Sequence, residues 1–196
     1  MSKSEISIAQ LRETHRDARS TLSTDLLKSN ASALVDQMVQ TNEFVSSKHV
    51  ASYIAIRGEI DSQPLMYRYP DKAYYLPVLR EQNMFFAPWK PGATLVNKAF
   101  GLLEPDTQES EWIKAKDLDL VLVPLVVFDP KCNRIGQGGG FYDRTFEFLH
   151  NRAGVEKPVL VGLAHECQLE PILRVQAWDV PLDLVVTESS VYRRNW

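Results

Sequence analysis

The sequence predicts an α/β fold, a three-layer α/β/α arrangement in which helices cover both faces of a mostly parallel central sheet. Apolar runs such as residues 118–128 lack the alternation of a half-exposed strand, which is typical of strands buried on both faces. Segments of helical periodicity separate these runs. A glycine-rich loop, residues 136–140, leads from one apolar run into a helix. The 196 residues suffice for one domain, predicted to span residues 1–196.

The first part of the chain, residues 6–44, is predicted to be helical. Side chains recurring at steps of three and four form one stripe of the first helix, namely Ile8, Leu11, His15, Ala18 and Leu22. The sequence Ser-Thr-Asp at residues 23–25 predicts a break and the cap of a second helix.

The remaining elements alternate along the chain. Residues 49–56 form the first predicted strand, residues 58–61 a loop, and Ser62 caps a short helix that ends near Tyr69. Residues 90–117 are mixed, with turns at Pro91-Gly92 and Glu104-Pro105. A helix is predicted over residues 142–150, and further strands over residues 73–79, 84–87, 119–123, 158–163 and 182–186.

Composition limits the kinds of partner. The net charge of −3 argues against a general nucleic-acid binder, so any anion site must be local. The two cysteines give no disulfide framework and fit a reducing compartment. The apolar stretch 120–128 contains a proline and is too short to span a membrane, and residues 1–8 lack a signal core. We therefore expect a cytoplasmic protein with neither nucleic-acid nor membrane partners.

The glycine-rich loop is the strongest candidate for a binding site. Four glycines in the five positions from Gly136 to Gly140 are costly to order, which favours a backbone that must approach a ligand. Bare backbone N–H groups flanked by Arg134 and Arg144 predict a phosphate site. Asp143 either caps the following helix or holds the magnesium ion that accompanies phosphates. The alternative is a glycine-rich hairpin or an ordinary helix entry, and the flanking charges favour the anion site.

Other charged residues follow or precede the predicted strands. Glu59 follows the first strand, where a carboxylate binds the amino groups of a heterocycle or is simply solvated. Asp183 begins the last strand and either joins Asp143 at a metal ion or is exposed. A zinc site at His165 and Cys167 is disfavoured by their spacing and by the lack of a fourth ligand, so we expect His165 to make a local hydrogen bond.

A set of motifs then points to a known family. The segment from Arg134 to Arg144, preceded by Val123-Pro124 and Phe128-Asp129, resembles the signature of 5-formyltetrahydrofolate cyclo-ligases, also called 5,10-methenyltetrahydrofolate synthetases. Residues 58–62, 75–78, 101–105, 162–168 and 178–187 are similar to other motifs of that family, in the family's order. The resemblance extends over nearly the whole chain, from about Leu11 to Thr187.

This resemblance implies a scaffold similar to that of sugar-phosphate isomerases and coenzyme A transferases. It implies an enzyme that uses ATP and Mg²⁺ to convert 5-formyltetrahydrofolate to 5,10-methenyltetrahydrofolate, ADP and phosphate, without a covalent nucleophile. The formyl oxygen is phosphorylated, and the folate N10 then attacks the activated carbon. We expect 5-formyltetrahydrofolate and ATP as partners, and a monomeric protein.

The resemblance also implies roles for individual residues. Asp143 and Asp183 correspond to acids at the magnesium ion, Glu59 to the carboxylate that binds the pterin, and Ile54 to an apolar substrate contact. The residues that correspond to ATP-binding positions are Arg12, Arg134, Ile135, Gly136, Gln137, Gly138, Gly139, Gly140, Phe141 and Tyr142.

Departures from the family pattern at three positions leave alternatives open. Ile8 stands where many family members have a lysine, and Gln137 and Gly139 stand where some have basic residues. The alternatives are a relative that binds folate or nucleotide without turnover, and an enzyme like the sugar-phosphate isomerases on the same scaffold.

Overall fold

A computed structural model describes residues 6–98, 103–150, 152, 154 and 156–196 of the chain. Its central element is a seven-stranded sheet in the order β11-β10-β9-β6-β1-β2-β3. The strands span His49–Ala51 (β1), Ala73–Arg80 (β2), Asn83–Pro88 (β3), Leu120–Pro124 (β6), Val159–Leu163 (β9), Leu184–Val186 (β10) and Val191–Arg193 (β11). Neighbours from β10 to β2 are parallel, whereas β11 and β3 pair antiparallel at the two edges. The prediction of a mostly parallel sheet is confirmed.

Two capped helices begin the described chain, as the sequence predicts. Helix α1 spans Ile8–Ser20, and its N-cap Ser7 forms a reciprocal capping box with Gln10. Helix α2 spans Thr24–Met38, and the Ser23 hydroxyl accepts a hydrogen bond from the Leu26 N–H. Thr41 caps a further short helix, α3 (Asn42–Ser46), so the predicted helical region ends in a separate turn.

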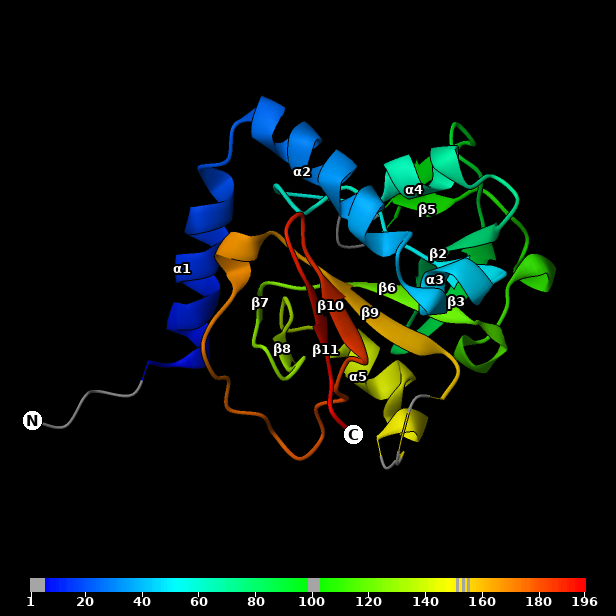
Figure 1. Cartoon of the computed structure of the whole chain (residues 1–196). Coiled ribbons are helices and arrows are strands. Elements are labelled where there is room, and N and C mark those ends of the chain that lie inside the picture. Colours follow the sequence, from blue (N-terminus) through cyan, green and yellow to red (C-terminus); the bar gives the residue numbers. More distant parts are fainter. Residues whose placement is uncertain (1–5, 99–102, 151, 153, 155) are drawn as a thin grey trace, which may run out of the picture.

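The two faces of the sheet have separate cores. On one face α2, α3 and α4 (Gln63–Arg68) bury side chains such as Leu34, Phe44 and Leu65 against the strands. These three helices lie together on one side of the sheet in Figure 1. On the other face Phe146 and Leu149, in and beside α5 (Phe141–Thr145) and the 3₁₀ segment Glu147–Leu149, pack against Phe86, Val121 and Val185. The predicted third layer is therefore present but consists of short pieces.

Several boundaries differ from the sequence prediction. Strand β1 ends at Ala51 rather than at residue 56, because the chain then turns to line a cavity. The helix predicted over residues 142–150 begins at Phe141 and changes to 3₁₀ geometry after Thr145. The mixed region contains the short pair β4 (Leu95–Asn97) and β5 (Leu103–Pro105). Of the predicted motif 101–105, residues 101 and 102 lie outside the described residues.

A second small pair of strands was not predicted, and it positions the glycine-rich loop. Strands β7 (Val127–Phe128) and β8 (Arg134–Ile135) pair antiparallel, with Phe128 opposite Arg134. This hairpin follows β6 directly and turns the chain back, so that residues 136–140 begin beside the carboxyl end of β6. Hydrogen bonds from Val126 N–H to Ile135 O and from Cys132 N–H to Asp129 O brace it.

The strand order fixes where a ligand can enter. From β1 the chain moves to β2 on one side, whereas β6, β9 and β10 follow one another on the other side. The order therefore reverses between β1 and β6, and open parallel sheets bind ligands at the carboxyl ends beside such a reversal. Helix α1 contacts β7 and the 3₁₀ segment Glu166–Gln168 after β9, so it stands at this end of the sheet and on neither face (Figure 1).

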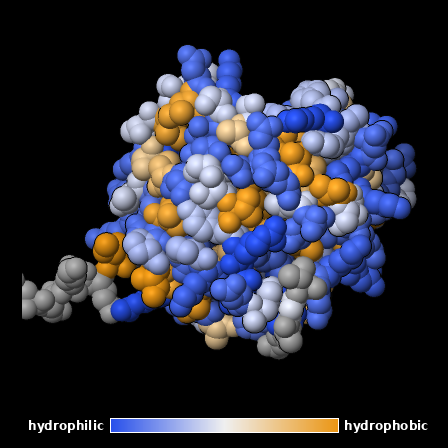
Figure 2. Space-filling model, viewed as in Figure 1, coloured by the Kyte–Doolittle hydropathy of each residue, from blue (hydrophilic) through white to orange (hydrophobic). Residues whose placement is uncertain are grey.

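The surface of the face seen in Figure 1 is mainly hydrophilic, with hydrophobic residues in separated spots, several of them on the side of α1 (Figure 2). Among the described residues, no helix combines the length and the apolar character needed to cross a membrane.

Candidate active site

A cavity of about 620 Å³ lies at the carboxyl ends of β1, β2 and β6. The chain after β1 supplies Tyr53, Ile54 and Glu59, and helix α1 supplies Arg12. The whole segment from Arg134 to Asp143 lies along the wall, and Arg174, Gln176, Trp178 and Asp179 complete it. The cavity thus brings together every residue predicted for ATP, for substrate and for the metal, with the exception of Asp183.

The glycine-rich loop presents bare backbone to this cavity. Gly138 and Gly140 have φ values of +105° and +66°, a region that favours glycine over residues with a side chain. A Cβ atom on Gly140 would lie 2.6 Å from Arg144 Nη1, so there is no room for a side chain without a shift. Arg12 Nε donates a 2.8 Å hydrogen bond to Gly136 O, which holds its guanidinium against the loop. The loop and α1 together form a cationic, backbone-lined wall.

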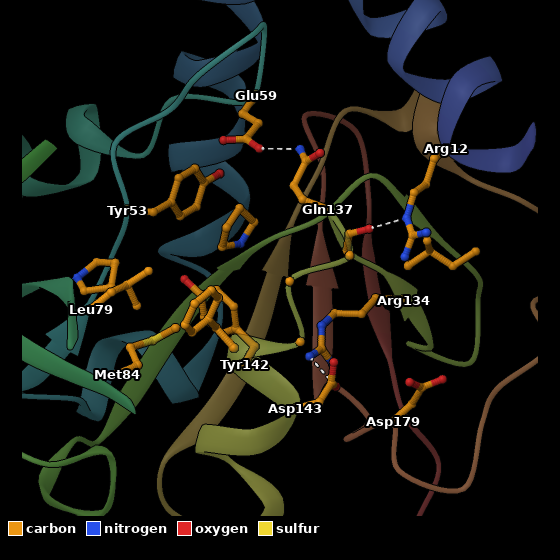
Figure 3. Close-up of a pocket in the computed structure, with 18 of the residues that line it drawn as sticks. Arg12, Tyr53, Glu59, Leu79, Met84, Arg134, Gln137, Tyr142, Asp143 and Asp179 are labelled. Carbon is orange, nitrogen blue, oxygen red and sulfur yellow. Dashed lines mark hydrogen bonds and ion pairs between the residues drawn. The ribbon is translucent and has the colours of Figure 1, made fainter. Parts of the chain in front are cut away.

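The charged half of the cavity contains side chains of both positive and negative charge. Arg134 Nη2 and Asp143 Oδ1 form an ion pair of 2.7 Å, with the arginine side chain 6% exposed. Val180 anchors both partners, because its N–H donates to Asp143 at 3.2 Å and its carbonyl accepts from Arg134. Asp179 lies on the same side of the cavity as this pair (Figure 3). A bound phosphate chain would therefore meet fixed positive charge and hard oxygen ligands together.

The opposite half is mostly apolar. Tyr53, Leu79, Met84 and Tyr142 line it, away from Arg12 and Arg134 (Figure 3). The Tyr53 hydroxyl donates to Ile60 O over 2.7 Å, and burial raises its pKa well above the usual value, so the ring stays neutral. Burial likewise raises the pKa of Tyr142. These rings and aliphatic side chains suit a flat, largely apolar ligand.

Glu59 stands where the two halves meet. Its Oε1 accepts a 3.2 Å hydrogen bond from Gln137 Nε2, and its Oε2 accepts one from Ile56 N–H, also at 3.2 Å. Arg19, itself 2% exposed, places a guanidinium nitrogen 4.0 Å from Oε1. Burial raises the pKa of Glu59, and the neighbouring hydrogen bonds and Arg19 oppose that shift. A buried carboxylate with few partners is a strong acceptor for the N–H groups of a heterocycle.

Comparison with known proteins decides the family. A model of the 5-formyltetrahydrofolate cyclo-ligase family matches residues 5–188. The chain belongs to this family. The 5-formyltetrahydrofolate cyclo-ligase of Escherichia coli K12 is 34% identical over 182 residues, which cover 90% of this chain and 98% of the relative. The Haemophilus influenzae cyclo-ligase is 36% identical over 146 residues, 71% of this chain and 76% of the relative.

A solved structure from the same family has the same fold. The NMR structure of 5,10-methenyltetrahydrofolate synthetase from Aquifex aeolicus superimposes with a TM-score of 0.81 at 32% identity, covering 95% of this chain and 92% of that one. The α/β fold predicted from the sequence is thus confirmed by the structure and by a member of the cyclo-ligase family.

Asp183, expected from the family resemblance to be a second acid at the metal, lies elsewhere in this cyclo-ligase family member. It is buried and pairs with Arg152 at 2.9 Å, and its Oδ2 accepts a hydrogen bond from the Leu160 N–H. Its other oxygen has no partner among the described residues, and burial raises its pKa to about 6. The physical reason is its position: it precedes β10, and the starts of parallel strands lie at the edge of the sheet opposite their carboxyl ends.

Sequence reasoning missed several residues of the site. Asp179 and Trp178 line the cavity, but the sequence analysis assigned a role to neither. They belong to the motif 178–187, and an acid next to an aromatic side chain was a signal that could have predicted a binding site there. Arg16, on helix α1, also reaches the site, since its Nη2 donates a 2.6 Å hydrogen bond to Gln137 Oε1. The ring of His165 makes hydrogen bonds, as expected, but they are not local, since its partners Asn30 and Gly58 O lie 135 and 107 residues away in the sequence.

Proposed function

We propose that the protein converts 5-formyltetrahydrofolate to 5,10-methenyltetrahydrofolate while ATP is cleaved to ADP and phosphate. The observation that carries this proposal is the division of one cavity into an apolar half and a charged half, with Glu59 and Gln137 in contact between them. One substrate must be flat and largely apolar, and the other must carry a chain of negative charges. A folate and ATP have these properties.

The charged half receives the triphosphate. The backbone of Gly136 and of residues 138–140 lines it, and Arg12 lies against the same loop. Arg134, at the start of the same segment, supplies a second fixed cation. Phosphoryl transfer needs mainly positioning and charge neutralisation, and this wall provides both.

The residues present also fit a magnesium ion. No cluster of three or more histidine, cysteine, aspartate or glutamate side chains that could hold a metal is found in the described ranges. Magnesium, however, is usually held by one or two carboxylates together with phosphate oxygens and water. Asp143 would hold it, and Asp179 is the second carboxylate in the same half of the cavity. When bound, the ion would offset the negative charge of the β- and γ-phosphates.

The apolar half receives the folate. Glu59 accepts hydrogen bonds from the amino and ring N–H groups of the pterin, in place of the bond that it now accepts from Gln137. Ile54 and Tyr53, beside it in the wall, exclude water from the pterin face. The formyl group on N5 then points to the boundary between the two halves of the cavity, towards the glycine-rich loop.

The reaction balances without a covalent nucleophile. The formyl oxygen attacks the γ-phosphorus and ADP leaves, which gives an N5-iminium phosphate. The lone pair of N10 then forms a bond to the formyl carbon. The carbon–oxygen bond breaks, phosphate departs and N10 loses its proton. The side chains described above hold the reacting atoms close and stabilise the charge that develops.

The test is the absorbance of the methenyl product during incubation of the purified protein with 5-formyltetrahydrofolate, ATP and Mg²⁺, with each component omitted in turn. We expect a rise only when all components are present. No rise, with folate still bound in calorimetry, would instead favour a binding protein without turnover. Neither turnover nor folate binding would favour the alternative of a sugar-phosphate substrate.

A further inference from the structure

Arg19 is a buried arginine that lies behind Glu59 and is not among the residues that line the active-site cavity. It belongs to the last turn of α1, and its side chain is 2% exposed. Arg19 Nη1 lies 4.0 Å from Glu59 Oε1, the oxygen that also accepts a hydrogen bond from Gln137. Burying a charged group is costly, so an arginine at this depth needs a partner of opposite charge and a set of hydrogen-bond acceptors. Arg19 has both.

The acceptors are backbone carbonyls of two different segments. Arg19 Nε donates a 3.1 Å hydrogen bond to Arg57 O, in the turn after β1. Arg19 Nη1 donates a 3.4 Å hydrogen bond to Leu125 O, directly beyond the carboxyl end of β6. One guanidinium therefore ties α1 to the chain beyond β1 and to the chain beyond β6, the two neighbouring strands at which the order of the sheet reverses.

The turn that leads to Glu59 has a backbone that needs such support. Arg57 and Gly58 have φ values of +50° and +74°, so two successive residues are left-handed and the first of them carries a side chain. The turn also lies close to α1, because a Cβ atom on Gly58 would be 3.4 Å from Arg19 O. His165 Nε2 holds the next carbonyl, Gly58 O, at 3.1 Å. Arg19 and His165 thus hold successive carbonyls of the turn and fix the place of Glu59.

The charge of Arg19 also acts on the Glu59 carboxylate. Burial raises the pKa of Glu59, and the nearby guanidinium of Arg19 opposes that shift. Arg57 acts in the same direction, but it is exposed, so solvent screens its charge. Burial raises the pKa of both Tyr53 and Tyr142, so these neighbours of Glu59 are neutral hydroxyls. Ionisable groups near Arg19 itself are Arg16 on α1, and His165 and Cys167 after β9.

We infer that Arg19 is a positioning residue for the folate: without touching the substrate, it holds Glu59 in place and negatively charged as the acceptor for the pterin N–H groups. The inference rests on the proposed function. A role in packing alone would require no charge at residue 19. A bound pterin would exclude water from Glu59, and the attraction between the two charges grows as water leaves. Arg19 therefore matters most when the folate is bound.

The experiment compares wild-type protein with Arg19→Gln, which removes the charge, and with Arg19→Lys, which keeps it. The control for net charge is Lys28→Gln, since Lys28 is exposed and lines no part of the cavity. Urea unfolding first establishes which variants are folded. Calorimetry then gives the dissociation constant of 5-formyltetrahydrofolate between about pH 5 and pH 8. Steady-state kinetics near neutral pH give kcat and the KM of each substrate.

In Arg19→Gln we expect the acidic limb of folate affinity to move upward by about 1 pH unit, because loss of the opposite charge raises the pKa of Glu59. The folate KM near neutral pH should rise by about 3- to 10-fold, whereas kcat and the KM for ATP should change by less than about twofold. Arg19→Lys should keep the limb in its wild-type position. Lys28→Gln should match wild type in every quantity.

A double variant separates charge from packing. Arg19→Gln added to Glu59→Gln should change folate affinity by less than about twofold, because the carboxylate on which Arg19 acts is gone. An unmoved limb in Arg19→Gln, or an equal loss of affinity with and without Glu59, would overturn the inference and leave the proposed function intact.

The lysine variant decides the matter if Arg19→Gln does not fold. A limb that moves upward although the charge is kept would overturn the inference, and an unmoved limb would support it. Wild-type protein that binds folate with the expected shifts in the variants, but shows no turnover, would overturn the proposed reaction and leave the role of Arg19 in folate binding. Wild-type protein that binds no folate would overturn both.

Discussion

Gln137 Nε2 donates a 3.2 Å hydrogen bond to Glu59 Oε1, which joins the glycine-rich loop to the segment after β1. Gln137 also accepts from Arg16, so a continuous chain of three side chains crosses the cavity from α1. A pterin bound at Glu59, as proposed, would compete with Gln137, and a nucleotide bound at the loop, as proposed, would contact the segment that carries Gln137. The two binding halves therefore share one polar contact, and a change at either end is expected to be felt at the other.

Replacing Glu59 by glutamine tests its assignment to the folate. Loss of a charged acceptor for the pterin N–H groups should raise the KM for 5-formyltetrahydrofolate by about 10- to 100-fold, and the KM for ATP by much less. Steady-state kinetics with each substrate varied in turn would measure both effects. An unchanged folate KM would reject the assignment.

The pH dependence gives a control for the same residue. Burial raises the pKa of Glu59 above the usual 4.5, so the carboxylate proposed to bind the pterin is lost at a higher pH than an ordinary carboxylate would be. Folate affinity should fall as the pH falls through that raised pKa, and the Glu59→Gln variant should lack this acidic limb. The same acidic limb in both proteins would point to another titrating group.

Asp143→Asn should remove turnover that depends on Mg²⁺ while folate binding persists. The asparagine oxygen can still accept from Val180 N–H and from Arg134, so the fold is expected to be retained. Without the anionic oxygen ligand, kcat should fall by about 100-fold or more. Activity titrated against Mg²⁺, with folate affinity from calorimetry, separates the two effects. Turnover with the wild-type dependence on Mg²⁺ would contradict the metal assignment.

The glycine-rich loop allows a comparison within a few residues. Gly140→Ala forces a side chain into a left-handed conformation with φ of +66° and onto Arg144, and should lower the free energy of unfolding by about 1–2 kcal/mol. Gly136→Ala is the matched control, because its Cβ would meet nothing within 4 Å and its φ is not in that region. Denaturant unfolding without ligands would measure both. Equal losses would show that backbone conformation is not the cause.

His165→Gln should change how stability depends on pH. The buried ring donates from Nε2 to Gly58 O and accepts from Asn30, and burial lowers its pKa from 6.5 to about 4. The unfolded chain therefore binds the proton first as the pH falls. The contribution of His165 is present above pH 6.5 and is lost towards pH 4, by up to about 3 kcal/mol.

The difference between the two proteins isolates this effect. Asp183, with a pKa raised to about 6, acts in the opposite direction over the same range, since the folded state binds its proton first. Because Asp183 is present in both proteins, its contribution cancels when His165→Gln is compared with wild type. Free energies of unfolding measured from pH 7 to pH 4.5 should converge for the two proteins. Parallel curves would contradict the prediction.

Local signals in the sequence were sufficient for most of the fold. Caps at Ser23, buried apolar runs and the glycine-rich loop each reflect an interaction within a few residues, and the structure confirms the elements that they predicted. Lengths were less predictable. Residues 53–56 read as strand because they are apolar, but their neighbours in space form a cavity wall, and no local pattern distinguishes a ligand wall from a sheet partner.

In the site, too, residues with a local sequence signal were predictable, and residues that depend on contacts between distant segments were not. Residues 134–143 were predictable because one continuous loop carries them, and Glu59 because it follows a strand at the carboxyl edge. Asp179 and the contact between Arg16 and Gln137 depend on segments that meet only in the folded chain. Asp183 shows the reverse case, an acid whose chemistry suits a metal but whose place before β10 directs it to Arg152.

The long-range contacts of helix α1 affect the order in which the parts of the protein fold during synthesis. It is the first described helix, yet Arg12 bonds to Gly136, 124 residues later, and His15 to Cys167 and Glu170, 152 and 155 residues later. On a ribosome, α1 emerges early and has no surface to dock on until most of the chain has followed. A nascent chain that stops before residue 136 would contain the residues of β1, β2 and β6 but not the glycine-rich loop that is proposed to bind ATP. Nucleotide binding should therefore be among the last properties that the growing polypeptide acquires.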